Sequence, residues 1–280
     1  MKTRREIIKS GLGLAGIIAA GKAPAALIRS LVAARAAMTG WKKLPYDAEV
    51  EYLESTGTQW IDTGTPATSN THVNVQFSDY TVAGRWLFGA RKAFQNSALG
   101  VYTESSNNVW RRAFGNFISE TFTFSTIDLG VTTFDYDCGH FVATREKVPI
   151  TVDFTDTAPV FDSSPRTIYL WTLNNGGATA YIAHAKIYGF KIWENGILVR
   201  DMIPVRVGSE GAMYDRVSGQ LFRNAGTGAF VIGPVKARGA SGQNGGGWYK
   251  WLIVPNDSGP SWRPCAQSWR QSPSSLKEAA

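Results

Sequence analysis

Three glutamates near the start of the central region have a spacing that could serve the cleavage of a glycosidic bond. Glu49, Glu51 and Glu54 fall within the run Glu-Val-Glu-Tyr-Leu-Glu. Retaining hydrolysis needs one carboxyl group as acid and one carboxylate as nucleophile, about 5–5.5 Å apart. A bulge in one strand could bring Glu49 and Glu54 to the same face at that separation. The alternative, which we favour, is an acidic first strand whose carboxylates face solvent.

Two tryptophans stand beside asparagines, a combination that suits sugar binding. Such a site needs an aromatic ring for stacking and planar polar groups for hydrogen bonding. Trp110 follows Asn107 and Asn108, and Trp171 precedes Asn174-Asn175. In the alternative interpretation the two indoles fill the core and the asparagines make turns. Arg111-Arg112 could receive an acidic glycan or form a solvated strand edge.

The other ionisable residues form no clear metal, cofactor or nucleophile motif. Cys138 stands two residues before a histidine, which alone is a weak pattern for zinc. No Gly-x-Ser-x-Gly elbow is present. We therefore expect no metal and no cofactor, with calcium at rim carboxylates as the alternative. The calcium candidates are Asp135, Asp137, Asp153 and Asp156, and the histidines, all far apart, are His72, His140 and His184.

Residues 46–233 show the two-residue apolar period of β-strands. The run from His72 to Phe77 shows it most clearly, because valines and Phe77 alternate there with polar residues. Short aromatic segments follow one another with turn signals roughly every ten residues, and no long amphipathic helix pattern interrupts them. This spacing predicts an all-β sandwich or barrel.

The strongest turn signal is Asn195-Gly196, because a type I′ turn needs positive φ at both central residues. We expect a two-residue hairpin that pairs Ile192 with Val199. In that register Asp201 falls on an otherwise apolar face. Its carboxylate should bond turn amides or a nearby arginine such as Arg206.

The segment from Glu51 to Gly64, EYLESTGTQWIDTG, resembles the opening of concanavalin A-like, LamG-type domains of gut-bacterial surface proteins and phage tail proteins. The segments from Leu87 to Ala90 and from Lys186 to Gly228 are similar to later markers of that family. The resemblance covers roughly residues 48–233 and implies a jelly-roll β-sandwich. It implies no single function, since this fold hosts lectins, glycosidases and adhesion modules. Some jelly-roll glycosidases carry Glu-x-Asp-x-x-Glu mid-domain, whereas here the middle acid is Glu51 and the run is at the start.

The first 25 residues are typical of an export signal. A basic start with Arg4 and Arg5 precedes a mildly apolar, Gly-rich stretch too short to span a bilayer as a stable helix. Ala23 and Ala25 fit the small-x-small cleavage rule, so we place the cut after Ala25, with a later alternative near Ala37. Thr3 to Lys9 resembles the twin-arginine motif. The resemblance implies export by the twin-arginine (Tat) machinery to the periplasm, the cell surface or the medium, with no integral membrane segment after processing.

The charge distribution bears on the partners of the protein, and the cysteine content on its possible disulfide. The net charge of +7 is confined to the two ends, because residues 46–233 hold 14 Lys/Arg and 19 Asp/Glu, a net charge of −5. A nucleic-acid-binding domain concentrates positive charge on its fold, so nucleic acid is not an expected partner. Cys138 and Cys265 could form one disulfide or remain two free thiols.

Four segments are expected from these patterns. Residues 1–25 are the signal, 26–45 a linker or short helix, 46–233 the concanavalin A-like jelly-roll β-sandwich, and 234–280 a Gly/Ser/Pro-rich tail that we expect to be disordered. We expect an exported, non-catalytic module that recognises glycan or protein at the cell envelope. The alternatives are a jelly-roll glycoside hydrolase and a purely structural envelope protein. A ligand site is expected on the less regular strands between Trp86 and Asn175.

Overall fold

A computed structural model describes residues 42–93, 96–118, 121–148, 150, 152–156, 160–162, 165–236 and 248–249. The chain divides into two compact units. The smaller unit includes one antiparallel pair, β1 (Lys42–Lys43) and β22 (Trp248–Tyr249), in which Lys42 lies opposite Tyr249. The larger unit contains the described residues from Pro45 to Lys236.

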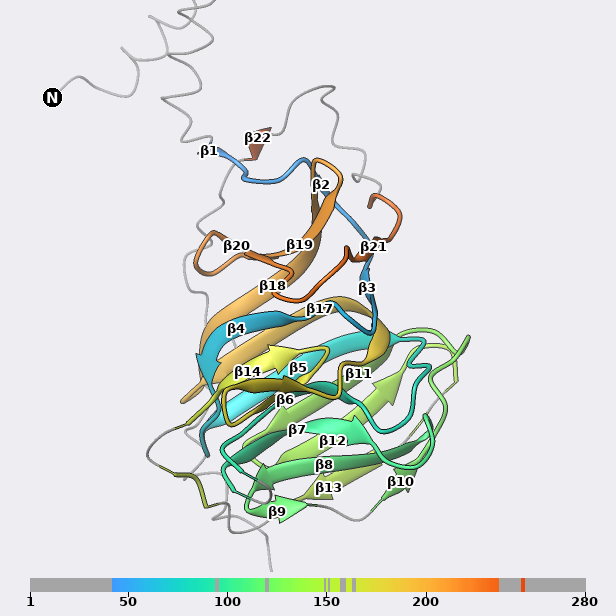
Figure 1. Ribbon diagram of the computed structural model, residues 1–280, viewed down its shortest axis with the longest axis vertical. Coiled ribbons are helices and arrows are strands. Elements are labelled where there is room, and N and C mark those ends of the chain that lie inside the picture. The colour runs from blue at the N-terminus through green and yellow to red at the C-terminus, as the bar shows by residue number, and fades with distance from the viewer. Residues whose placement is uncertain are drawn as a thin grey trace, which may run out of the picture. The chain divides into compact units, whose positions relative to one another are not determined.

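The larger unit is a sandwich of two sheets, stacked face to face in Figure 1. Its strands pair antiparallel, except that β15 runs parallel to β6. The nine-stranded sheet has the order β10 (Phe122–Thr123), β8 (Val109–Gly115), β7 (Ala98–Thr103), β6 (Trp86–Arg91), β14 (Thr167–Leu170) and β4 (Ile61–Pro66), with β9 (Phe117–Ile118), β15 (Leu173–Asn175) and β16 (Ala178–Ala180) attached.

The eleven-stranded sheet forms the second layer. Its order is β13 (Val152–Thr155), β12 (His140–Arg145), β11 (Thr132–Asp137), β5 (Thr71–Ser78), β17 (His184–Glu194), β18 (Ile197–Val207), β19 (Glu210–Asp215) and β20 (Gln220–Arg223), with β2 (Ala48–Glu49), β3 (Leu53–Thr56) and β21 (Val231–Ile232) attached.

The expected all-β fold is confirmed, and the two-sheet arrangement fits a jelly-roll. The part of the chain that the structure describes contains no helix, and hence none long and apolar enough to cross a membrane. The expected signal with Arg4, Arg5, Ala23 and Ala25 lies outside the described residues, as do Cys265 and nearly all of the predicted tail. The two alternatives for Cys138 and Cys265, one disulfide or two free thiols, therefore both stay predictions.

The Asn195-Gly196 hairpin forms as expected, but its register changes at a bulge. The φ values are 52° at Asn195 and 76° at Gly196, as a type I′ turn requires. Trp193 lies opposite Leu198, whereas Ile192 lies opposite Arg200, so Val199 is the extra residue of the bulge. The predicted pairing of Ile192 with Val199 is therefore wrong, because one inserted residue shifts every later pair.

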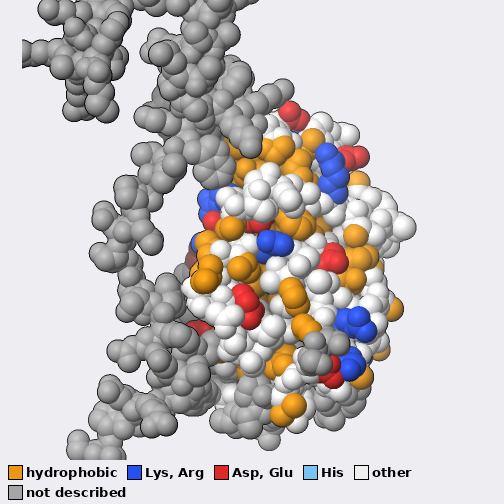
Figure 2. All heavy atoms as spheres, turned by 90° about the vertical axis from the view of Figure 1, so that its left-hand side faces the viewer, with side chains coloured by type: hydrophobic (Ala, Val, Ile, Leu, Met, Phe, Trp, Pro, Cys, Tyr) orange, Lys and Arg blue, Asp and Glu red, His pale blue; other side chains and the backbone are white. Residues whose placement is uncertain are grey.

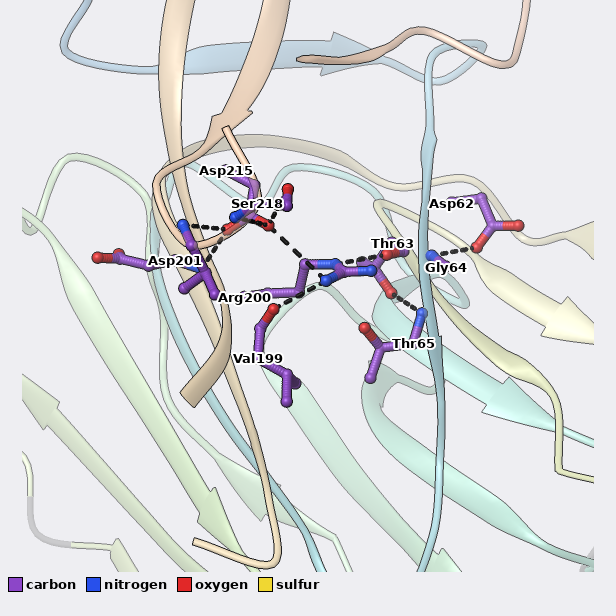
Figure 3. Close-up of polar contacts among 10 residues, drawn as sticks. Asp62, Thr63, Gly64, Thr65, Val199, Arg200, Asp201, Asp215 and Ser218 are labelled. Carbon is purple, nitrogen blue, oxygen red and sulfur yellow. Dashed lines mark hydrogen bonds and ion pairs between the residues drawn. The ribbon is translucent and has the colours of Figure 1, made fainter. Parts of the chain in front are cut away.

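This bulge turns Arg200 toward the interior and Asp201 away from it. Figure 3 shows the Arg200 side chain reaching Thr63 on β4 of the other sheet, where Nε donates to the carbonyl oxygen at 2.9 Å. Arg200 Nη1 lies 3.7 Å from Asp215, whose side chain is fully buried. Asp201 instead accepts two bonds from Arg216, at 2.9 and 2.6 Å. Its arginine partner is thus Arg216 and not Arg206.

Asp215 takes the turn amides that we expected for Asp201. Its carboxylate accepts the backbone N–H groups of Asp201 at 2.8 Å, Val217 at 3.1 Å and Ser218 at 3.2 Å, and the Ser218 hydroxyl at 2.6 Å. A buried carboxylate is stable only when such donors replace its lost hydration. Arg200 and Asp215 together therefore tie the end of the hairpin to the opposite sheet.

The space between the sheets is filled by aromatic rings. The largest fully buried side chains include Trp110, Trp171, Tyr80, Tyr136 and Phe77. The Trp110 ring meets the edges of Phe77 at 5.6 Å and Phe134 at 5.2 Å between centroids. Edge-to-face pairs of this kind stabilise a core beyond the burial of their area.

A buried ion pair crosses this aromatic core. Arg112 on β8 donates two bonds to Asp156, at 2.9 and 2.8 Å, and the two side chains are 7% and 1% exposed. The Tyr136 hydroxyl on β11 donates to the same carboxylate at 2.6 Å. Burial, together with the Asp156 charge, raises the pKa of Tyr136 well above its usual value, so the phenol keeps the proton that it donates. The three residues join the two sheets.

On the face seen in Figure 2, Lys/Arg and Asp/Glu side chains are interspersed singly among apolar and neutral groups. The described side chains visible on that face form no broad patch of one sign, and a nucleic-acid-binding surface is typically a broad positive patch.

The buried pair gives a prediction for stability. Replacing Asp156 with Ala leaves the Arg112 guanidinium buried without its carboxylate, so the free energy of unfolding should fall by about 3–5 kcal/mol. The matched control is Asp153→Ala, because Asp153 pairs with His140 in an exposed contact, with side chains 64% and 49% exposed. That change should cost less than about 1 kcal/mol. Urea denaturation measures both, and equal losses would contradict the role given to Asp156.

Candidate functional site

The glutamates with glycosidase-like spacing lie on different strands. Glu49 is on β2, which pairs with β18, and accepts a bond from the Tyr46 hydroxyl at 3.1 Å. Glu54 is on β3, opposite Lys186 of β17 and Val231 of β21. The arrangement of Glu49 and Glu54 on a single strand, which the hydrolase alternative requires, is therefore not formed.

The tryptophans considered for sugar binding lie in the core, as the alternative interpretation has it. Trp110 and Trp171 are both 0% exposed. Their ring N–H groups donate to the carbonyl oxygens of Phe124 at 3.1 Å and Ala185 at 2.9 Å, as buried indoles require. Asn174 is 3% exposed and bonds the backbone of the β14–β16 region, and Asn108 bonds Ser106. Neither indole offers an exposed face to a ligand.

The acids considered for calcium are engaged by arginine or histidine side chains. Asp156 binds Arg112, Asp153 binds His140 at 2.9 Å, and Asp135 contacts His72. Asp137 lies 4.0 Å from the same His72. Among the residues that the structure describes, no group of three or more His, Cys, Asp or Glu side chains is placed to hold a metal ion.

A different group of residues gathers on the outer face of the nine-stranded sheet. On β7 and β8 the inward side chains, Leu99, Val101, Trp110 and Phe114 among them, belong to the main core. Trp86, Ala98, Ala113 and Leu173 form a separate apolar cluster with Tyr102. Because successive strand residues face opposite sides, this second cluster lies outside the sandwich. We define the Trp86 cluster as Trp86, Tyr102, Arg91, Arg111, Glu104 and Asn175.

Two stacked rings form the centre of the Trp86 cluster. Tyr102 lies opposite Trp86 on the neighbouring strand, with ring centroids 4.4 Å apart and planes 16° from parallel. Trp86 is only 5% exposed, while Tyr102 is partly exposed. The tyrosine is thus the outer ring of the pair, and the indole supports it from below.

Glycines make room for the indole. An added Cβ at Gly89 would lie 2.4 Å from the Trp86 ring, and one at Gly100 would lie 2.9 Å from it. Glycine in the interior of a strand often marks the close approach of another group. Gly89 and Gly100 lie opposite each other in the sheet, so together they leave the space that Trp86 occupies.

Charged and amide groups border the ring pair. Arg91 lies over the Trp86 ring at 5.9 Å, and its Nε donates to Asn175 at 2.9 Å. Arg111 lies opposite Tyr102 on β8, and its Nη2 is 3.1 Å from Glu104. Burial raises the pKa of Tyr102, while the charges of Arg111 and Arg91 act in the opposite direction. Both guanidinium groups are therefore close enough to influence the same phenol.

Further aromatic residues adjoin the cluster. Tyr181 is 48% exposed, and its carbonyl oxygen accepts a hydrogen bond from the backbone N–H of Trp86 at 3.0 Å. Its φ of 62° is uncommon for a tyrosine, and such conformations often occur at functional sites. Tyr169 of β14, which lies opposite Gly89, stacks on Trp60, the residue before β4, with ring centroids 4.5 Å apart. Aromatic rings therefore extend across this face.

The cluster lies between Trp86 and Asn175, the stretch in which the sequence predicts a ligand site. Of the residues named from the sequence, it contains Arg111 and Asn175. Sequence reasoning missed Trp86, Tyr102, Arg91 and Glu104. The signal that could have found them is the pair of glycines within strands, since Gly89 and Gly100 mark a closely approached surface.

The outer face of the eleven-stranded sheet carries a second polar group. The His72 ring stacks on Trp193 at 4.3 Å, and Asn74 donates to Asp135 at 3.3 Å. Asp135 also contacts His72. These side chains bond one another and, unlike those of the Trp86 cluster, include no guanidinium group, so the group offers a ligand less than the Trp86 cluster does.

Comparisons with known proteins leave the family of the chain undefined. No protein-family model matches it, and no curated protein does. It is similar to a solved Bacteroides ovatus structure named "putative carbohydrate binding protein", with 11% identity, a TM-score of 0.45, and coverage of 68% of this chain and 61% of that one. It is also similar to a mutant of NanB sialidase from Streptococcus pneumoniae, with 10% identity, a TM-score of 0.36, and coverage of 66% and 39%.

The chain spans less than two thirds of the length of either of these proteins. Similarity at this level carries no assignment of function. The choice of a function therefore depends on the geometry of the Trp86 cluster.

Proposed function

We propose that the sandwich is a non-catalytic glycan-binding module and that the Trp86 cluster is its binding site. One observation carries the proposal: the partly exposed Tyr102 ring is supported by Trp86 and bordered by Arg111, Arg91 and Asn175. Sugar rings have an apolar C–H face that packs on an aromatic ring, and hydroxyl groups that bond amides and guanidinium groups. The cluster provides both kinds of partner on one rigid sheet.

A rigid support favours binding because less freedom is lost when the ligand arrives. Trp86 is fixed between the glycines and Tyr102, and Arg91 is fixed by Asn175 and the indole. The glycoside hydrolase alternative has less support, since Glu49 and Glu54 lie on different strands. A purely structural envelope protein would not need an aromatic and guanidinium group on an outer face.

The proposal includes export by the twin-arginine route and action at the cell envelope or outside the cell. This part is supported by the residues from Thr3 to Ala25 alone.

Replacing Tyr102 with Ala should weaken glycan binding by about 10-fold or more, because it removes the stacking surface at the centre of the site. Affinity electrophoresis of the full chain against a panel of soluble polysaccharides measures the effect. The matched control is Tyr188→Ala, a partly exposed tyrosine on β17 of the other sheet, whose hydroxyl lies 3.1 Å from Ser78. Loss of binding in both variants, or in neither, would contradict the proposed site.

Replacing Gly89 with Ala should displace the Trp86 ring, because the new Cβ would lie 2.4 Å from it. We expect a loss of about 1–3 kcal/mol in stability together with weaker glycan binding. Gly189→Ala is the control, since its nearest neighbour would be Gln76 at 3.6 Å. Denaturation and binding assays compare the two. Unchanged affinity in Gly89→Ala would show that the position of Trp86 is not needed.

Replacing Arg4 and Arg5 together with Lys should hold the protein in the cytoplasm, because the export machinery reads the arginine pair as an address. Fractionation of bacterial cells with a twin-arginine pathway measures it, with Arg29→Lys as the control. Equal export of the double variant would rule out this route.

A further inference from the structure

Arg111 and Arg91 lie on either side of the Tyr102 strand. β8 and β6 flank β7, and both arginines are on the outer face that also carries Tyr102 and Trp86. A ligand stacked on Tyr102 would therefore contact a guanidinium group at its border. A guanidinium group presents parallel N–H donors that match the two oxygens of a carboxylate.

The acid that Arg111 holds is exposed. Its ion pair with Glu104 has an N–O distance of 3.1 Å, with side chains 31% and 44% exposed. Exposed pairs contribute little to stability and exchange readily with other anions. In addition, Arg111 Nε is buried and meets no acceptor among the described residues. A ligand would meet the exposed part of the guanidinium and not this buried Nε, and at that exposed part the carboxylate of Glu104 is easily displaced.

Arg91 is held differently. Its Nε is bonded to Asn175, and its guanidinium carbon lies over the Trp86 ring. These contacts fix the direction of the group. It can therefore add positive potential at Tyr102 without reorganising, in agreement with its effect on the pKa of that phenol.

We infer that the Trp86 cluster recognises a carboxylated sugar residue within an acidic polysaccharide. The sugar ring lies on Tyr102, and its carboxylate takes the place of Glu104 on Arg111 within the field of Arg91. This inference rests on the proposed glycan-binding function and narrows it to one class of ligand. Glu104 acts as an internal competitor that occupies Arg111 when no glycan is bound.

The test uses the full chain and matched polysaccharides. Polygalacturonate and alginate are each compared with the same polymer after chemical reduction of its carboxyl groups, with dextran sulfate and neutral xylan as further probes. Isothermal titration calorimetry measures binding. We expect binding to a carboxylated polymer that falls about 10-fold or more on reduction, because a charge-assisted pair is lost.

Two variants act in opposite directions. Arg111→Gln should weaken binding to the carboxylated polymer about 10-fold, while Glu104→Gln should tighten it about 2- to 5-fold by removing the competitor. Arg223→Gln is the control. Arg223 on β20 forms a similar exposed pair with Glu210 on β19, at 2.6 Å, so this variant should leave the affinity for the polymer unchanged. Glu104 is exposed, so its variant keeps the test valid even if Arg111→Gln fails to fold.

The outcomes separate the two proposals. Equal binding to native and reduced polymers, or an unchanged affinity in Glu104→Gln, overturns the carboxylate assignment and leaves glycan binding in place. Equal binding to dextran sulfate also overturns it, because it indicates unselective capture of anions. Binding to no polysaccharide overturns both the inference and the proposed function.

Discussion

Two carboxylates buried in the sandwich, Asp156 and Asp215, impose the strictest constraint on this structure. An ion placed between the sheets costs several kcal/mol unless donors replace the water that it loses. Asp156 obtains them from Arg112 and Tyr136, and Asp215 from turn amides and Ser218, with Arg200 nearby. The donors of Asp156 come from strands 44 and 20 residues away in the sequence, whereas the donors of Asp215 lie within 14 residues of it. The sandwich must therefore close in one register for the charge of Asp156 to be satisfied, while beside Asp215 it is Arg200 that bonds the opposite sheet, at Thr63.

This constraint also determines where recognition can take place. Alternation along β8 sends Arg112 into the core and Arg111 to the outer face. The core also takes Trp110 and Trp171, whose N–H groups are bonded to backbone carbonyl oxygens. The residues left for a ligand are those of the outer face. One strand thus supplies both a structural arginine, Arg112, and the arginine proposed to bind a ligand, Arg111, and its fixed register places the second as firmly as the first.

The sequence was sufficient to predict the strands, but not which side chains of each strand point into the core. The alternation from His72 to Phe77 and the Asn195-Gly196 turn predicted β5 and the β17–β18 hairpin. A bulge such as the one at Val199 leaves no mark on a single strand, since it exists only relative to a partner. The strands β6 to β8 have apolar side chains on both faces, so alternation could not separate the core indole of Trp110 from that of Trp86.

The net negative charge of the domain limits the ways in which an acidic ligand could be recognised. Residues 46–233 carry a net charge of −5, so their long-range field repels an anion instead of steering it to the site. Recognition must then come from contacts within a Debye length, about 8 Å at physiological ionic strength. Moderate salt would screen the repulsion between the domain and a polyanion more than the close contact at Arg111. Selection for carboxylate would accordingly depend on the geometry of Arg111, Arg91 and Tyr102, and much less on net charge.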